Sequence, residues 1–187
     1  MAPTYLLVFY LIMFPFRFCV LCGSEIAESK LPTEDRPRLV CISCGYIHYI
    51  NPKLVCGTLP VQNGAVWLLR RGIEPRVGYW SYPAGFQELD ESSEEAACRE
   101  TKEEIGCDVT IVSLFGVYSS ARAPVVNVVY LASLLPTSAP PMTTLEAIEV
   151  RAFEPSDLPW DDLAFHSTRQ ALLDWVRWSE GPQLAEV

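Results

Sequence analysis

Residues 85–107 read GFQELDESSEEAACRETKEEIGC and place Arg99 beside three glutamates, Glu100, Glu103 and Glu104. On an α-helix, side chains three or four positions apart are neighbours, so the three carboxylates share one face. Like charges at this spacing destabilise an isolated helix by roughly 0.2–0.5 kcal/mol per pair, and a cation among them removes that repulsion. Carboxylate oxygens favour Mg²⁺ or Mn²⁺, and Mg²⁺ is commonly shared with substrate phosphates. The pattern therefore predicts a divalent-metal site that acts on a phosphate ester.

A helix must hold these carboxylates at the edge of a cleft, and the flanking residues predict one of about three or four turns. Asp90, Ser92 and Ser93 offer N-cap oxygens, and Gly106 can end the helix with a positive φ. A solvated acidic helix face is the alternative explanation. The opposite side of the helix is small or apolar and can lie against a sheet, with Ala97, Cys98, Thr101 and Ile105.

The glycine and charged positions of this segment resemble the signature of the Nudix hydrolases, G-x5-E-x7-R-E-x2-E-E-x-G. The preceding WSYPAG at 80–85 is similar to the W-x-L-P-G/A-G loop of that family. The signature positions are Gly85, Glu91, Arg99, Glu100, Glu103, Glu104 and Gly106. The segment departs from the family at Tyr82, Asp90, Thr101 and Cys107.

The resemblance implies a mechanism in which bound Mg²⁺ or Mn²⁺ bridges pyrophosphate oxygens and lowers the pKa of a bound water. Water attacks one phosphorus and the other phosphate leaves. Arg99 would orient a neighbouring carboxylate, Glu103 or Glu91, by a charge-assisted hydrogen bond. The implied metal ligands are Glu100, Glu103, Glu104 and the backbone carbonyl near Gly85.

Residues outside the signature helix are candidates for contacts with the substrate. Trp80 and Phe86 are large aromatics beside the loop, and they could either pack in the core or stack on a base. The general base is left open. Glu103 is one candidate, and Glu146 or Glu149, which arrive before a late strand, are the others.

Four of the seven cysteines form two C-x2-C knuckles, Cys19–Cys22 and Cys41–Cys44, each followed by glycine. The 18 residues between the knuckles fit a zinc ribbon. Four thiolates would fill the coordination shell of the zinc, so the ion would be structural and not catalytic. The alternative is that the four cysteines form disulfides. The other cysteines and the two histidines are expected to be structural: Cys56, Cys98, Cys107, His48 and His166.

At 187 residues and half apolar, the chain can bury one sizeable core and one small module. We expect an apolar extension at 1–17, a zinc ribbon at 18–50 and a Nudix domain at 51–180. The net charge of −9 argues against nucleic acid as a partner, and zinc thiolates argue for a reducing compartment.

The N-terminal extension is apolar from Tyr5 to Phe16, but it is too short to span a bilayer and contains Pro15. It also lacks the basic region and cleavage site of a secretory signal. A membrane partner is not expected. A segment packed on the ribbon, a membrane-surface contact and a truncated targeting sequence all stay open, so chloroplast and cytoplasm are not distinguished.

The alternation of apolar runs with helical segments along the chain predicts an α/β fold. The resemblance implies the Nudix α/β/α sandwich with a mixed sheet. Asn63-Gly64 between two apolar runs, 54–61 and 65–69, is a strong hairpin signal. Further strands are expected at about 108–119, 125–134 and 149–153. An amphipathic helix at 168–178 is expected to close the domain.

A zinc ribbon followed by GYIHYINPK and the signature is closest to the zinc-ribbon Nudix hydrolases, including plant chloroplast FAD and ADP-ribose pyrophosphatases. The NADH-cleaving branch carries S-Q-P-W-P-F-P-x-S after the signature, and this chain has no such stretch. The resemblance implies cleavage of FAD to FMN and AMP, or of ADP-ribose to AMP and ribose 5-phosphate. NADH or another dinucleotide is the alternative substrate, and a nucleotide-sensing adaptor is the non-enzyme alternative. Relatives of this type are often dimers, so a homodimer is left open.

Overall fold

The computed structural model describes residues 17–181, and the chain divides into two compact units between Pro52 and Lys53. Apart from Arg17, the extension expected at 1–17 lies outside the described residues. Over 17–181, no helix is long and apolar enough to cross a membrane.

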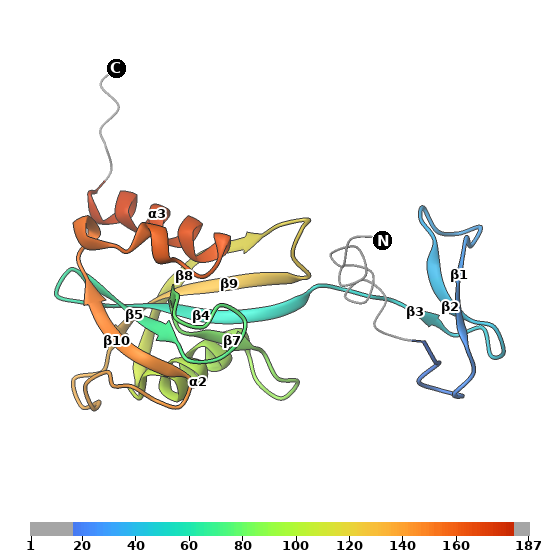
Figure 1. The fold of residues 1–187 in the computed structure, drawn as a ribbon, viewed down its shortest axis with the longest axis horizontal. Helices are drawn as coiled ribbons and strands as arrows, with labels where there is room; N and C mark the ends of the chain where they lie inside the picture. The colour runs from blue at the N-terminus through green and yellow to red at the C-terminus, as the bar shows by residue number, and fades with distance from the viewer. Residues whose placement is uncertain (1–16, 182–187) are drawn as a thin grey trace, which may run out of the picture. The chain divides into compact units, whose positions relative to one another are not determined.

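The first unit is a three-stranded antiparallel sheet in the order β1-β2-β3 (Figure 1). Its strands are β1 (Ile26–Ser29), β2 (Arg38–Cys41) and β3 (Ile47–His48). Gly23 and Gly45 end the two cysteine knuckles with φ of 73° each, a conformation that glycine adopts without steric cost.

His48 is buried in this first unit, as a structural histidine should be. Its ring packs edge-on against Tyr46, with 4.7 Å between the ring centroids.

The second unit is a seven-stranded sheet whose main path runs β10-β5-β4-β9-β8, with β6 paired to β5 and β7 paired to β4. The pair β4–β9 is parallel and the others are antiparallel, so the sheet is mixed. The strands are β4 (Lys53–Gln62), β5 (Ala65–Arg71), β6 (Trp80–Ser81), β7 (Ala84–Phe86), β8 (Val109–Ser119), β9 (Val125–Leu134) and β10 (Ala147–Phe153).

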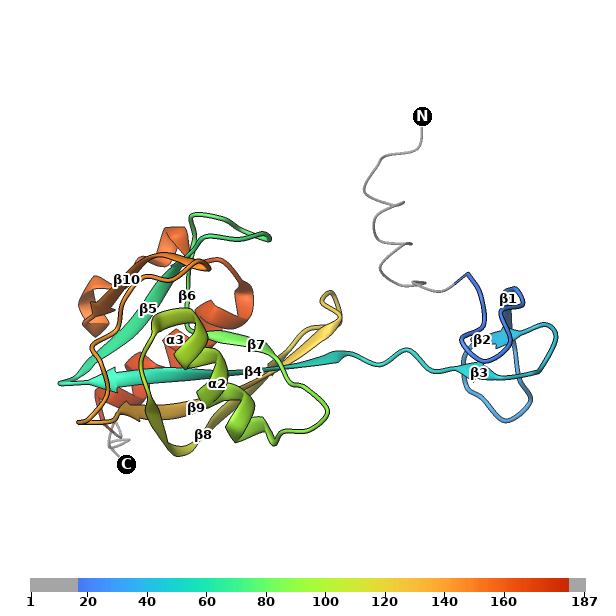
Figure 2. The same cartoon turned by 90° about the horizontal axis from the view of Figure 1, so that it is seen from below.

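Two helices cover the two faces of this sheet, α2 (Ser93–Ile105) on one and α3 (His166–Ser179) on the other (Figure 1). Figure 2 shows α2 lying across β4. Two short 3-10 turns, Pro155–Asp157 and Trp160–Asp162, lead into α3. The expected α/β/α sandwich is confirmed.

The predicted hairpin joins β4 to β5 through Asn63 and Gly64, with φ of 53° and 81°. Both residues have positive φ, as a type I′ turn requires. Leu68 and Leu69, adjacent in β5, belong to opposite apolar clusters because successive strand side chains point to opposite faces. The cluster toward α3 includes Leu59, Leu68, Val129, Leu172 and Trp175. The cluster toward α2 includes Leu69, Ile105, Cys107, Ala132 and Ala147.

Helix α2 begins and ends where its sequence predicts. The Ser92 side chain accepts a hydrogen bond from the Glu95 backbone, and the Glu95 carboxylate accepts one from the Ser92 backbone, which completes a capping box. Gly106 ends the helix with φ 72°, and its N–H donates to the carbonyl of Lys102.

A buried hydroxyl pair joins α2 to β4. The Oγ1 atoms of Thr58 and Thr101 are 2.7 Å apart, and both residues are fully buried. Thr101 already donates its proton to the carbonyl of Ala97, so the Thr58 hydroxyl is the donor to Thr101. Thr101 follows Glu100 in the chain, so its bond to Thr58 helps to set the distance between the acidic face of α2 and the sheet.

We predict that Thr101→Val lowers the free energy of unfolding by about 1–3 kcal/mol, because the buried Thr58 hydroxyl loses its acceptor. In Thr58→Val/Thr101→Val, where no orphaned hydroxyl is left, the loss should be smaller than in Thr101→Val alone. Urea unfolding of the wild type, both single variants and the double variant measures the coupling. Strictly additive losses would show that the hydroxyls do not act as a pair.

Candidate active site

The acidic face of α2 lies beneath the loop between β6 and β7. Glu104 is only 4% exposed, and its Oε2 accepts a 2.7 Å hydrogen bond from the Ala84 backbone N–H. The backbone of Gly85 lies so close to Glu100 that a Cβ at this position would overlap the Glu100 carboxylate. A side chain at Gly85 would therefore force the Glu100 carboxylate to move, and the start of β7 brings backbone groups to the two carboxylates.

Arg99 is the cation that ties the acidic residues together. Its Nε and Nη2 donate to the two carboxylate oxygens of Glu91 at 2.9 and 2.6 Å. Its Nη1 donates to Glu100 at 2.7 Å and to Glu103 at 2.9 Å. Its Nη2 also donates to the backbone carbonyl of Phe86 at 3.1 Å, which links the helix to the loop.

Burial and hydrogen bonding make these carboxylates electrostatically unequal. Desolvation raises the pKa of Glu104 to about 8 and also raises the pKa of Glu100, despite the nearby guanidinium of Arg99. The bidentate bond from Arg99 holds the pKa of Glu91 down at about 2. For the buried Glu104 and the partly buried Glu100, the cost of desolvation thus outweighs the nearby positive charge, whereas the charge of Glu91 is matched by Arg99.

This donor set fits a divalent cation, because hard carboxylate oxygens and a backbone carbonyl are the ligands of Mg²⁺ and Mn²⁺. One nitrogen of the Arg99 guanidinium, Nη1, bonds to both Glu100 and Glu103. Within residues 17–181, the acidic side chains do not gather three ligand atoms within 4.8 Å of one another. Glu103, with its side chain 59% exposed, is the most accessible of the three glutamates.

The two late glutamates lie in different surroundings. Burial is the main cause of the raised pKa of Glu100 and of Glu104, and the charge of Glu146 adds a smaller contribution to both. Glu149 instead pairs with Arg70 at 3.4 Å. A shift in the β10–β5 register between Ala147 and Glu149 separates the two environments.

The two candidate aromatics also differ. Trp80 is 6% exposed, packs edge-on against Phe153 at 4.9 Å and belongs to the core, and it does not line the cavity beside the loop. Phe86 is 49% exposed and does line that cavity. Lys53 Nζ lies 4.9 Å from the centroid of the Phe86 ring.

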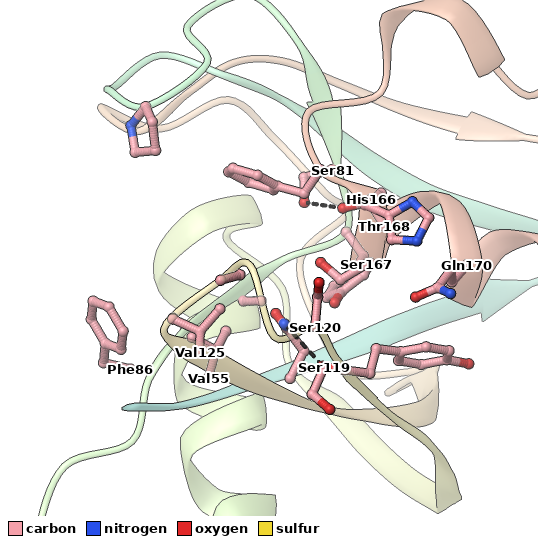
Figure 3. A pocket seen from close by; sticks show the side chains of 18 of the residues that line it. Val55, Ser81, Phe86, Ser119, Ser120, Val125, His166, Ser167, Thr168 and Gln170 are labelled. Atoms are coloured by element: carbon pink, nitrogen blue, oxygen red, sulfur yellow. Dashed lines mark hydrogen bonds between the residues drawn. The ribbon is translucent and has the colours of Figure 1, made fainter. Parts of the chain in front are cut away.

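The cavity, shown in Figure 3, has a volume of about 370 Å³. Ala84 and Gly85 are among the residues that line it, and the same two residues contact the glutamates. Sequence reasoning missed most of its lining, which includes Arg71, Asn127, Phe165, His166 and Gln170. These residues come from distant segments, and each alone has the pattern of an ordinary strand or helix residue. His166 begins α3, as expected for a helix-start residue, but it also faces the cavity.

The predicted cysteine quartet assembles in the first unit. One sulfur from each of Cys19, Cys22, Cys41 and Cys44 lies within 4.8 Å of the other three. A hydrogen bond from the Ser24 backbone is the main cause that lowers the pKa of the Cys22 thiol to about 6. The backbone N–H of Cys44, 3.4 Å from the Cys41 sulfur, lowers the pKa of Cys41. The pKa of Cys44 is raised instead, to about 12, by hydrogen bonds with the other cysteine sulfurs. Four sulfurs this close together are the donor set of a tetrahedral Zn²⁺, which binds them as thiolates.

Two family models match the chain along nearly all of its described length. Residues 53–176 match the NUDIX domain, and residues 17–50 match the domain described as Nudix N-terminal.

Proteins with related sequences and structures agree with those matches. An ADP-ribose pyrophosphatase of Methanocaldococcus jannaschii is 31% identical over 140 residues, which cover 73% of this chain and 80% of that protein. A crystal structure of a NUDIX hydrolase from Nitrosomonas europaea is 36% identical, with a TM-score of 0.79, and the match covers 88% of this chain and 91% of that one. A NAD-capped RNA hydrolase NudC of Haemophilus influenzae is 33% identical over 105 residues, covering 54% of this chain but only 37% of that protein.

For the quartet, we predict about one zinc per chain by elemental analysis of the purified protein. Cys41→Ser should lose most of this zinc and unfold the first unit, because three thiolates leave the tetrahedral shell incomplete. Cys98→Ser, at a half-buried cysteine outside the quartet, is the control and should keep the metal. Full zinc content in Cys41→Ser would show that the quartet does not bind the ion.

For the loop, we predict that Gly85→Ala displaces the Glu100 carboxylate and weakens Mn²⁺ binding by at least about tenfold, since a ligand position shifts. Electron paramagnetic resonance of free Mn²⁺ measures this. Gly78→Ala is the control, because a Cβ at Gly78 meets open space. Gly78 has a positive φ and Gly85 does not, so alanine is more strained at the control position, which makes the control stringent. Equal Mn²⁺ affinity in Gly85→Ala and the wild type would contradict the assigned contact.

Proposed function

The chain belongs to the Nudix family, and from this premise we propose that it is a metal-dependent pyrophosphatase acting on ADP-ribose, FAD or both. The products would be AMP with ribose 5-phosphate from ADP-ribose, and AMP with FMN from FAD. The observation that carries the proposal is a pair of carboxylates, the buried Glu104 and the partly buried Glu100, in contact with Ala84 and Gly85 of β7, which also line a cavity. ADP-ribose is supported by the name of the M. jannaschii relative, and FAD by the zinc-ribbon resemblance.

We assign the binding of Mg²⁺ or Mn²⁺ to Glu100, Glu103, Glu104 and the backbone carbonyl at Gly85. When bound, the ion would neutralise pyrophosphate oxygens and lower the pKa of a bound water. Arg99 would position Glu100 and Glu103 through its bonds to both, while its bidentate bond to Glu91 fixes the guanidinium.

Glu146 is the proposed general base. The attacking water forms a bond to one phosphorus, the bond from that phosphorus to the bridging oxygen breaks, and the water proton passes to the Glu146 carboxylate. Glu103 is a weaker candidate, because its carboxylate is already engaged by the guanidinium of Arg99 at 2.9 Å. Glu149 is paired with Arg70 instead.

Cleavage of NADH or another dinucleotide is the second candidate function, supported by the likeness to the NudC relatives. The chain spans about a third of the length of those relatives. A nucleotide sensor without activity is less well supported, since none of the signature glutamates is missing. Measuring AMP release from ADP-ribose, FAD and NADH separates the three.

We predict that Glu104→Gln lowers kcat for ADP-ribose by about 10²–10³-fold with Mg²⁺, because a buried charged ligand becomes neutral. Circular dichroism should show an unchanged fold. Glu94→Gln is the matched control, since Glu94 is exposed on the same helix. Near-wild-type turnover of Glu104→Gln would remove this residue from the metal site.

We predict that Glu146→Gln lowers kcat by about 10²–10⁴-fold with little change in KM, as expected when a general base is removed. Glu149→Gln, three residues further along the same segment, should stay within about threefold of the wild type, because surface ion pairs contribute little. The reverse ranking of the two variants would assign the base to Glu149.

A further inference from the structure

The cavity and the acidic face share one wall. Ala84 and Gly85 line the cavity, and the same two residues contact Glu104 and Glu100. A pyrophosphate bound over the glutamates would therefore hold one of its two attached groups at the mouth of this cavity. The lining shows which group that is.

The cavity wall is mostly apolar and contains no acidic side chain, although the chain has 23 acidic residues. Phe86, Val55 and Val125 form one side in Figure 3, and Ser119, Ser120 and Gln170 lie opposite them. Ribose 5-phosphate has hydroxyl and phosphate groups over its whole surface. Arg71 and His166 could meet some of them, but those against Phe86, Val55 and Val125 would lose water without gaining partners. A planar aromatic base can bury its faces there and present its polar edge to the other side.

Asn127 presents a fixed acceptor to this cavity. It lines the wall and is 9% exposed, and its Nδ2 donates to the backbone carbonyl of Tyr118 at 3.3 Å. A carbonyl oxygen can only accept, so the amide nitrogen must face Tyr118 and Oδ1 must face away from it. An amino group on a bound base would donate to Oδ1, whereas an oxo group would place two acceptors together.

We propose that this cavity is an adenine site in which Asn127 Oδ1 accepts from the 6-amino group, so that the enzyme selects adenosine diphosphate conjugates. This deepens the proposed function and rests on it. The terminal ribose of ADP-ribose, or the riboflavin part of FAD, then stays outside the cavity. One site would therefore accept both substrates. Guanine and hypoxanthine carry a 6-oxo group and would be rejected.

The test compares each substrate with its 6-oxo counterpart on the wild-type protein. The kcat/KM for ADP-ribose should exceed that for inosine diphosphate ribose by about tenfold or more. FAD should exceed its hypoxanthine analogue by a similar factor, because the same base would occupy the same site. Equal rates for the amino and oxo members of either pair would overturn the proposal.

Asn127→Ala should bring the amino-to-oxo ratio toward one, mainly by slowing the adenine substrates. Ser133→Ala, at an exposed position of the same strand, should keep the wild-type ratio. Unfolding of Asn127→Ala would leave the wild-type comparison to decide. A folded variant with the wild-type ratio would contradict the role of Asn127.

Binding of AMP and IMP without metal, measured by calorimetry, separates this proposal from the proposed function. AMP should bind about tenfold more tightly than IMP. If no conjugate is hydrolysed but AMP is preferred, the pyrophosphatase proposal fails and the adenine site stands. If ADP-ribose is hydrolysed and AMP and IMP bind equally, the adenine site fails alone.

Discussion

The close approach of Ala84 and Gly85, at the start of β7, to the acidic face of α2 is the contact on which the site depends. It gives Glu104 a backbone donor, and a side chain at Gly85 would displace the Glu100 carboxylate. Burial raises the pKa of both carboxylates. Desolvated carboxylates favour either a proton or a cation, so this contact is where the proposed metal would be held.

The rest of the domain holds this contact in place. The capping box and Gly106 set the ends of α2, and the buried Thr58–Thr101 pair sets its height on β4. Arg99 then connects the helix to the loop through the Phe86 carbonyl. Because the loop is also one wall of the cavity, the position of the helix determines where a bound base lies relative to the bond that breaks.

Features with local causes could be predicted from the sequence. The α2 caps, the Asn63-Gly64 hairpin and the cysteine knuckles each depend on residues close together in the chain, and all three formed as expected. The exposure of Phe86 and burial of Trp80 depend on packing against distant strands, which spacing does not reveal. The different surroundings of Glu146 and Glu149 depend on where β10 begins, because Glu146 precedes the strand and Glu149 lies in it beside Arg70. The cavity is assembled from the strands β4 to β9 and α3. These features arise from contacts between residues far apart in the chain, so they could not be predicted from the sequence.

Phosphorus NMR of ADP-ribose incubated with the wild-type protein in ¹⁸O-labelled water would show whether the chain is a metal-dependent pyrophosphatase. With Mg²⁺ or Mn²⁺ we expect AMP and ribose 5-phosphate, with one labelled oxygen on one of the two phosphates, and after chelation we expect no reaction. Undiminished hydrolysis in excess chelator, or products other than two monophosphates, would contradict this expectation.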